Sequence, residues 1–140
     1  MNVGEHSILL AEDSDDDAYF FSRTLVRAGS PCACKRVKDG EQAIRHLQMN
    51  QNRRHLMFLD LKMPHKGGFE VLEWLRQQPF KERIEVIVLS GSIQEADVLR
   101  AKELGALEYL SKPVSYLVLA GFINRWWKKC VGESPLNTSI

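Results

Sequence analysis

Short apolar runs alternate with longer segments of helical periodicity, and the alternation repeats five times along the chain. The short runs are typical of strands, and we expect these at residues 7–11, 33–37, 56–59, 85–89 and 107–110. The third and fourth runs are almost continuously apolar, as in strands that are covered on both faces. Strands and helices that alternate in this way predict a parallel sheet.

The segments between the runs predict helices at residues 15–28, 41–49, 69–77, 94–104 and 115–129. In the first of them, Ala18, Phe21 and Leu25 share one face at three- and four-residue spacing. Gly105 follows the fourth as a typical helix stop. Because 44% of the 140 residues are hydrophobic, the chain can form one well-packed core. We therefore expect one domain over residues 1–130 and a short polar tail over residues 131–140.

The nearly even balance of acidic and basic residues does not point to a strongly charged partner. The chain has 19 basic and 18 acidic residues and a formal net charge of +1, which gives no indication of a nucleic-acid or membrane partner. No signal peptide is recognisable, and no apolar run approaches the ~20 residues that cross a bilayer. We expect a cytoplasmic protein.

Cysteines and histidines give no clear site. Cys32, Cys34 and Cys130 cannot all pair within one chain, so we expect free thiols in a reducing compartment. The C-x-C pair lacks a second cluster at ligand spacing, which favours ordinary strand positions over a metal site. Four histidines show no spacing suited to metal binding or phosphoryl relay and are expected at the solvated surface: His6, His46, His55 and His65.

Polar side chains follow four of the five predicted strands. These residues are Glu12 and Asp13 after the first strand, Asp60 after the third, Ser90 after the fourth and Lys112 after the fifth. In an open parallel sheet, ligands bind beyond the carboxyl ends of the strands. Three carboxylates there repel each other by about 1 kcal/mol per pair at 4 Å in water and by more when desolvated. A hard cation such as Mg²⁺ relieves that repulsion.

A hydroxyl and an ammonium beside the carboxylates suit the oxygens of a phosphoryl group. Ser90 and Lys112 would supply these contacts, where positioning and charge neutralisation give most of the assistance. Asp60 is then the natural nucleophile. An isolated Asp at a strand end is more often only solvated, so the prediction depends on the whole set.

The set resembles the receiver domain of bacterial two-component response regulators over residues 6–130. The resembling segments are LLAEDSDDD, MFLDLKMPHKGGFEVL, VIVLSGS and YLSKPV. The resemblance implies a flavodoxin-like, doubly wound α/β fold, (βα)5, with five parallel strands in the order 2-1-3-4-5. The loop at residues 51–54 looks extended, as in the single-domain group that serves phytochrome-like or hybrid histidine kinases.

The resemblance also implies a magnesium-dependent phosphorelay function. Asp60 would accept a phosphoryl group from a sensor histidine kinase or phosphotransfer protein. Asp13, Asp60 and the backbone carbonyl of Lys62 would ligate Mg²⁺, and Glu12 would bind it through water. We expect a stand-alone phosphoryl acceptor with no output domain, and not an enzyme with a metabolic substrate. Its self-catalysed phosphorylation and dephosphorylation would at most be slow.

Three side chains would respond to the phosphoryl group in such a domain. Ser90 and Lys112 would contact it, and Tyr109 would move inward when Ser90 is drawn toward it. The Lys112–Pro113 bond would be cis. Glu12 and Ser90 replace the commoner Asp and Thr but keep the functional groups, whereas Lys62, two residues after Asp60, influences how long the phosphoryl group survives.

Four other interpretations stay open. Glu12 would also suit a helix start, and Tyr109 would also suit plain packing in the sheet. A degenerate receiver would act only as an interaction module, with Asp60 unmodified. A phosphatase of the haloacid dehalogenase type uses similar groups, but it needs a second Asp two residues after its nucleophile, where this chain has Lys62.

The last helix carries apolar residues beyond those that a core needs. The stripe of Leu119, Phe122, Ile123 and Trp126 should pack inward. Tyr116, Leu117 and Val118 leave the first turns apolar nearly all round, which suggests an interface with an unknown downstream protein or a second copy of the chain. This interface would lie on the face of the fourth helix, fifth strand and fifth helix. The alternative is a few harmless exposed residues; Trp127 would either join the surface or cap the helix.

Overall fold

The computed structural model describes residues 5–91 and 93–132 and shows one parallel sheet. Its five strands have the order β2-β1-β3-β4-β5, which confirms the predicted doubly wound fold. Every pairing between neighbouring strands is parallel. The strands are β1 (His6–Ala11), β2 (Cys34–Val37), β3 (Arg54–Asp60), β4 (Ile84–Ser90) and β5 (Glu108–Ser111).

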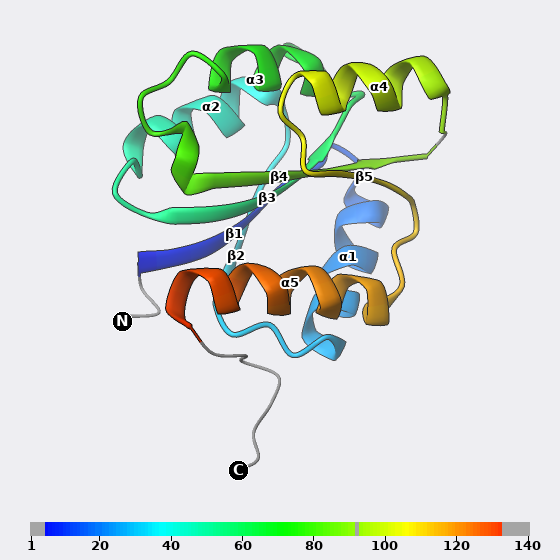
Figure 1. Cartoon of the computed structure of the whole chain (residues 1–140). Coiled ribbons are helices and arrows are strands. Elements are labelled where there is room, and N and C mark those ends of the chain that lie inside the picture. The colour runs from blue at the N-terminus through cyan, green and yellow to red at the C-terminus, as the bar shows by residue number, and fades with distance from the viewer. Residues whose placement is uncertain (1–4, 92, 133–140) are drawn as a thin grey trace.

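Within residues 5–91 and 93–132, five α-helices cover the two faces of the sheet (Figure 1). On one face lie α2 (Gly40–Met49), α3 (Gly68–Leu75) and α4 (Glu95–Glu103), and on the other lie α1 (Asp15–Arg27) and α5 (Tyr116–Val131). A short 3-10 helix, η2 (Lys81–Arg83), precedes β4. All five predicted helices are present, with ends that differ by a few residues.

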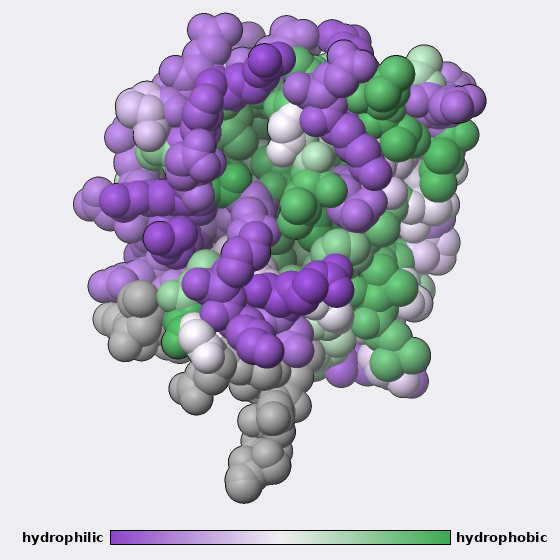
Figure 2. All heavy atoms as spheres, viewed as in Figure 1, coloured by the Kyte–Doolittle hydropathy of each residue, from purple (hydrophilic) through white to green (hydrophobic). Residues whose placement is uncertain are grey.

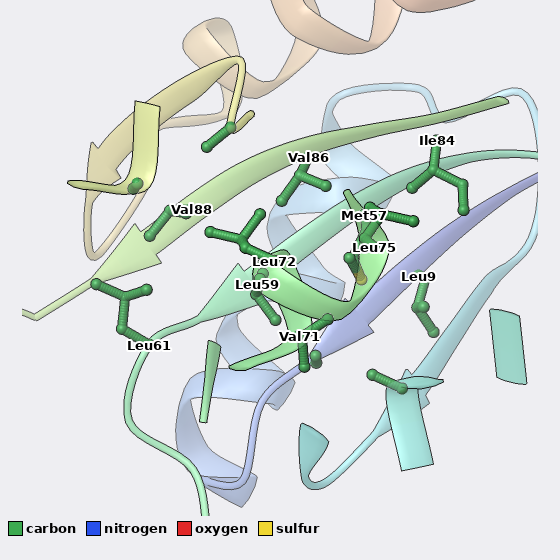
Figure 3. Close-up of a cluster of buried hydrophobic side chains, with 14 of the residues drawn as sticks. Leu9, Met57, Leu59, Leu61, Val71, Leu72, Leu75, Ile84, Val86 and Val88 are labelled. Atoms are coloured by element: carbon green, nitrogen blue, oxygen red, sulfur yellow. The ribbon is translucent and has the colours of Figure 1, made fainter. Parts of the chain in front are cut away.

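Each face of the sheet has its own buried cluster. Figure 3 shows Leu9, Met57 and Val86, from three adjacent strands, beside Val71 and Leu72 of α3. On the opposite face, the rings of Phe21 in α1 and Phe58 in β3 have their centroids 4.9 Å apart. Burial of such apolar surface is the main favourable contribution to folding, and it fixes β3 at the centre of the molecule.

Hydrogen-bonded caps set where the helices begin. The side chains of Ser14, Asp39 and Ser115 accept hydrogen bonds from the backbone N–H groups of Asp17, Gln42 and Val118. Such caps satisfy amides that have no partner inside the helix. The cap at Ser14 lies three residues after the end of β1, so it determines which residues of α1 face the edge of the sheet.

The C-terminal helix is longer than the sequence predicts. α5 continues to Val131, inside the predicted tail, and ends at Gly132, whose φ of 85° is left-handed; glycine adopts this conformation without a steric penalty. The remaining tail, residues 133–140, lies outside the described residues.

Trp127 is buried against His6, at 5.2 Å between ring centroids, so the prediction of a surface or capping role for it is wrong.

The prediction of surface histidines is wrong for His6 and His55, which are both buried. Both lie at the starts of central strands that helices cover on each side. His55 Nδ1 lies 2.9 Å from Ser7 Oγ, and Nε2 lies 3.1 Å from the carbonyl of Asn50. Because that carbonyl can only accept, Nε2 carries the proton and Nδ1 accepts from Ser7. Burial is tolerated because both ring nitrogens have partners.

The three cysteines are free thiols, as expected. Burial raises the pKa of Cys32 to about 11 and that of Cys34 to about 12. Thiols that hold their protons so strongly are poor nucleophiles.

No helix within residues 5–91 and 93–132 is both long enough and apolar enough to cross a membrane.

Candidate functional site

The predicted site residues meet at the carboxyl edge of the sheet. Asp60 and Ser90 are the last residues of the adjacent strands β3 and β4, and Glu12 and Lys112 directly follow β1 and β5. The backbone extends the sheet slightly beyond its strands, since Glu12 N–H donates to Val37 O at 3.0 Å and Lys112 N–H donates to Ser90 O at 2.8 Å. The ends of four strands are therefore held in register around one point.

Three carboxylates form a compact cluster at this edge. Glu12, Asp13 and Asp60 each offer one oxygen, and these oxygens all lie within 4.8 Å of one another. Glu12 and Asp60 are 2% and 7% exposed, and Asp13 is open to solvent. Such a set of hard oxygen ligands, with one side open for water, fits a divalent cation such as Mg²⁺.

Lys112 is the cation that the structure itself places against this cluster. Its Nζ lies 2.7 Å from Glu12, 2.9 Å from Asp17 and 3.5 Å from Asp60. Burial lowers the pKa of Lys112, but hydrogen bonds to Glu12 and Asp17 and the charge of Asp60 outweigh burial and raise the pKa above its usual value. Lys112 therefore stays charged and neutralises part of the cluster.

Glu12 is the most strongly perturbed carboxyl group of the site. Burial raises its pKa to about 7, against the lowering effect of the Lys112 hydrogen bond and with a further rise from Asp60. Its Oε2 also accepts a hydrogen bond from the backbone N–H of Ser14 at 3.2 Å. A group that costs this much to ionise in a protein interior is characteristic of functional sites, so a role limited to the helix start does not explain its burial.

The backbone around Asp60 is tightly constrained. Asp60 Oδ1 accepts a hydrogen bond from the N–H of Lys62 at 3.3 Å. The loop then returns so closely that a Cβ on Gly68 would lie 2.6 Å from the carbonyl oxygen of Asp60. Only glycine fits such an approach. The GG pair at the start of α3 therefore positions the strand end that carries Asp60.

The remaining predicted residues have clear places. Ser90 is buried at the end of β4, the strand next to β3, and Tyr109 is buried in β5 opposite Val88 of β4. The side chain of Lys62 is exposed. The Lys112–Pro113 peptide bond is cis, as predicted. A cleft of about 490 Å³ opens beside the site between α1 and the segment after β5, lined in part by Phe20, Lys112 and Pro113.

Sequence reasoning did not anticipate the contact of Asp17 with Lys112. From the sequence alone, Asp15, Asp16 and Asp17 are three acidic residues in the first turn of a helix, where acidic residues are common. Asp17 lies in the first turn of α1, three positions after the capping residue Ser14. That spacing is the signal that points from α1 back to the site.

The three residues of the predicted interface do not behave alike. Leu117 and Val118 are exposed, as expected, and Leu117 has 69% of its surface open. Tyr116 is half-buried, and the guanidinium of Arg27 lies 3.8 Å from the centre of its ring. Tyr116 therefore ties the start of α5 to α1. Figure 2 shows a band of apolar residues on the side of the molecule where α4 and α5 begin.

Comparison with known proteins gives one consistent family. The sequence pattern of the response regulator receiver domain matches residues 8–123. The chain is 37% identical over 110 residues to response regulator Rcp1 of Synechocystis, a match that covers 75% of each chain. It is 33% identical over 118 residues to a Vibrio cholerae protein named as a cyclic di-GMP phosphodiesterase, but it spans only 26% of that protein's length.

Solved structures give the same result at the level of the fold. A manganese-bound form of Rcp1 superimposes with a TM-score of 0.69 at 31% identity and covers 96% of both chains. The phosphorylated cyanobacterial phytochrome response regulator RcpA superimposes with a TM-score of 0.71 at 31% identity, covering 87% of this chain and 91% of that one.

Proposed function

The chain belongs to the response regulator receiver domain family, and from that premise we propose that it is a switch whose Asp60 accepts a phosphoryl group. The donor would be a sensor histidine kinase or a phosphotransfer protein, and the reaction would require Mg²⁺. The observation that carries the proposal is the convergence of Glu12, Asp13, Asp60 and Lys112 at one edge of the sheet. A merely structural role does not account for three clustered carboxylates beside a cation.

The transfer is a displacement at phosphorus. A carboxylate oxygen of Asp60 forms a bond to the phosphorus of a phosphohistidine, the phosphorus–nitrogen bond breaks, and the imidazole leaves with the electron pair. Asp60 Oδ2 faces Lys112, whereas Oδ1 is held by the N–H of Lys62. Fixed donors of this kind stabilise the charge that spreads over the transferred oxygens.

The carboxylate cluster fits the metal that this chemistry needs. Asp13, Asp60 and the carbonyl of Lys62 would hold Mg²⁺ directly, and Glu12 would hold it through water. The bound ion supplies neutralisation of the phosphoryl charge. Two acidic oxygens and several waters are the usual environment of Mg²⁺ in proteins.

Phosphorylation would then change the surface of the domain. The group adds roughly 1.5 to 2 negative charges beside Ser90 and Lys112, which draws both side chains toward Asp60. Ser90 ends β4, and Tyr109 lies in the neighbouring strand β5 opposite Val88, two residues before Ser90, so the loop after β4 and the Tyr109 ring would move together. The α4-β5-α5 face would report that change to a partner.

Beryllofluoride, a phosphoryl mimic, tests this function. With Mg²⁺ present, the wild type should bind it with chemical-shift changes around Asp60, Ser90 and Tyr109. Asp60→Asn should show none, whereas Asp16→Asn, which removes an exposed carboxylate of α1, should respond as the wild type does. A wild type that shows no Asp60-dependent change would favour a receiver used only for interaction. Rapid turnover of a small phosphomonoester would favour a phosphatase.

The exposed apolar start of α5 supports the proposal that the activated domain forms a homodimer. Leu117 and Val118 present apolar surface, and apolar surface of this kind is typical of interfaces. The mass in solution, measured by sedimentation with and without beryllofluoride, should increase on activation. Leu117→Glu should abolish the increase, and Val26→Glu, at an even more exposed apolar position of α1, should leave it intact. Equal effects of both variants would contradict this assignment.

A further inference from the structure

The ion pair between Asp17 and Lys112 is a contact that phosphoryl acceptance does not require. We propose that Asp17 is a positioning residue that holds Lys112 in the resting state and competes with the phosphoryl group for its ammonium. This inference rests on the proposed function, because it concerns the same lysine. We call the Asp17–Lys112 pair the latch.

The geometry of Lys112 shows how the competition arises. An ammonium has three N–H donors, and short hydrogen bonds to Glu12 and Asp17 occupy two of them, at 2.7 and 2.9 Å. Asp60 Oδ2 lies farther away, at 3.5 Å. The resting position of the ammonium is therefore set by Glu12 and Asp17 more than by the residue that would carry the phosphoryl group.

Asp17 differs from the two acidic residues that precede it. Asp15 is paired with Arg36, at 2.7 Å, and Asp16 forms no ion pair within the described ranges. Asp17 has its backbone N–H bonded to the capping hydroxyl of Ser14, which fixes its place in the first turn of α1. Its side chain is 48% exposed, yet it reaches an ammonium that is mostly buried.

The charge of Asp17 would persist when the other carboxylates are neutralised. Glu12, Asp13 and Asp60 form the cluster that suits Mg²⁺, and Asp17 does not belong to it. A metal ion therefore releases Lys112 from Glu12 but not from Asp17. A phosphoryl group on Asp60 must then compete with the Asp17 carboxylate for the ammonium, and it is also repelled by that charge. The latch thus lowers the affinity of the site for a phosphoryl group.

The first experiment observes the latch without any phosphoryl mimic. In isotope-labelled, metal-free protein, the side-chain ammonium signal of Lys112 should shift, and its protons should exchange faster with solvent, in Asp17→Asn. Asp16→Asn removes the same charge one residue away and should leave the signal unchanged. Asp17→Glu keeps a carboxylate within reach and should restore slow exchange. An unchanged signal in Asp17→Asn would overturn the latch.

The second experiment measures the competition. In saturating Mg²⁺, the beryllofluoride concentration for half-saturation should fall roughly fivefold in Asp17→Asn, the size expected for one close charge pair near the surface. Asp16→Asn should change it by less than about twofold. No change in Asp17→Asn, a change in the opposite direction, or equal changes in both variants would overturn the proposal. If the wild type binds no beryllofluoride, the proposed function itself is wrong; if the wild type binds it through Asp60 and only the Asp17→Asn comparison fails, the latch alone is wrong.

Discussion

Lys112 Nζ and Glu12 Oε1 are 2.7 Å apart, although 100 positions separate the two residues in the chain. The contact joins the ends of β1 and β5 across β3 and β4, and it brings the Lys112 ammonium against the most buried carboxyl group of the predicted site. Charge balance at the site therefore depends on Lys112, whose ammonium also lies 2.9 Å from Asp17 and 3.5 Å from Asp60.

Removal of that ammonium should strengthen metal binding. Lys112→Ala deletes a cation that competes with Mg²⁺ for Glu12 and Asp60. The affinity for Mg²⁺ should therefore rise about tenfold, because charges interact more strongly at a partly buried site than in water. Calorimetric titration well above pH 7, where Glu12 is ionised, measures this. Lys102→Ala, in which the lost ammonium was paired with Glu108, should change nothing. An unchanged or weaker affinity in Lys112→Ala would count against a shared site.

Two adjacent phenylalanines of α1 should differ sharply in their effect on stability. Phe21 is 4% exposed and packs on Phe58, whereas Phe20 is 52% exposed. Phe21→Ala should lower the free energy of unfolding by about 3–5 kcal/mol, the usual loss for a buried aromatic ring. Phe20→Ala should lower it by less than about 1 kcal/mol. Urea denaturation of both variants measures the difference, and similar losses would contradict the described packing of α1.

Gly68 should tolerate no side chain. A Cβ there would meet the Asp60 carbonyl oxygen at 2.6 Å and Leu61 Cα at 2.9 Å, so Gly68→Ala must displace the backbone that carries Asp60. We expect a lower free energy of unfolding and weaker Mg²⁺ binding. Gly121→Ala, in α5, meets only the Arg125 side chain at 3.9 Å and should stabilise the protein by about 0.5–1 kcal/mol. Thermal denaturation distinguishes them; a harmless Gly68→Ala would contradict the loop geometry.

His55 should make the stability of the fold depend on pH. Burial lowers its pKa below 6.5, and the nearby charges of His46 and Arg53 act in the same direction, against the hydrogen bond to Asn50. The unfolded chain then binds the proton more strongly, so stability is complete above pH 6.5 and falls as the pH drops from 6.5 through the lower folded pKa. Each unit of lowering corresponds to about 1.4 kcal/mol.

The stability of His55→Gln isolates this effect. Its free energy of unfolding should lie below that of the wild type at neutral pH, and the gap should narrow as the pH falls through this window. A gap that is constant with pH would show that His55 does not titrate differently in the two states.

The elements and the members of the site were predictable, whereas several of their partners were not. Alternating apolar runs located all five strands, and the order of polar residues after them located Asp60, Ser90 and Lys112. Residue type alone placed His55 at the surface, because its partner Ser7 is 48 positions away. The Asp17 pair with Lys112 spans 95 positions. Such contacts depend on how far side chains reach in the folded molecule.

Phosphorylation of Asp60 is the most direct test of the central claim. The wild type and Asp60→Asn would be incubated with Mg²⁺ and a small phosphoryl donor, and their intact masses would be compared. With Mg²⁺, the wild type should gain the mass of one phosphoryl group, located on the peptide that contains Asp60. Without Mg²⁺ the wild type should gain no mass, and Asp60→Asn should gain none in either condition. A wild type that gains no phosphoryl group, or an Asp60→Asn variant that gains as much as the wild type, would contradict the assignment of Asp60 as the phosphoryl acceptor.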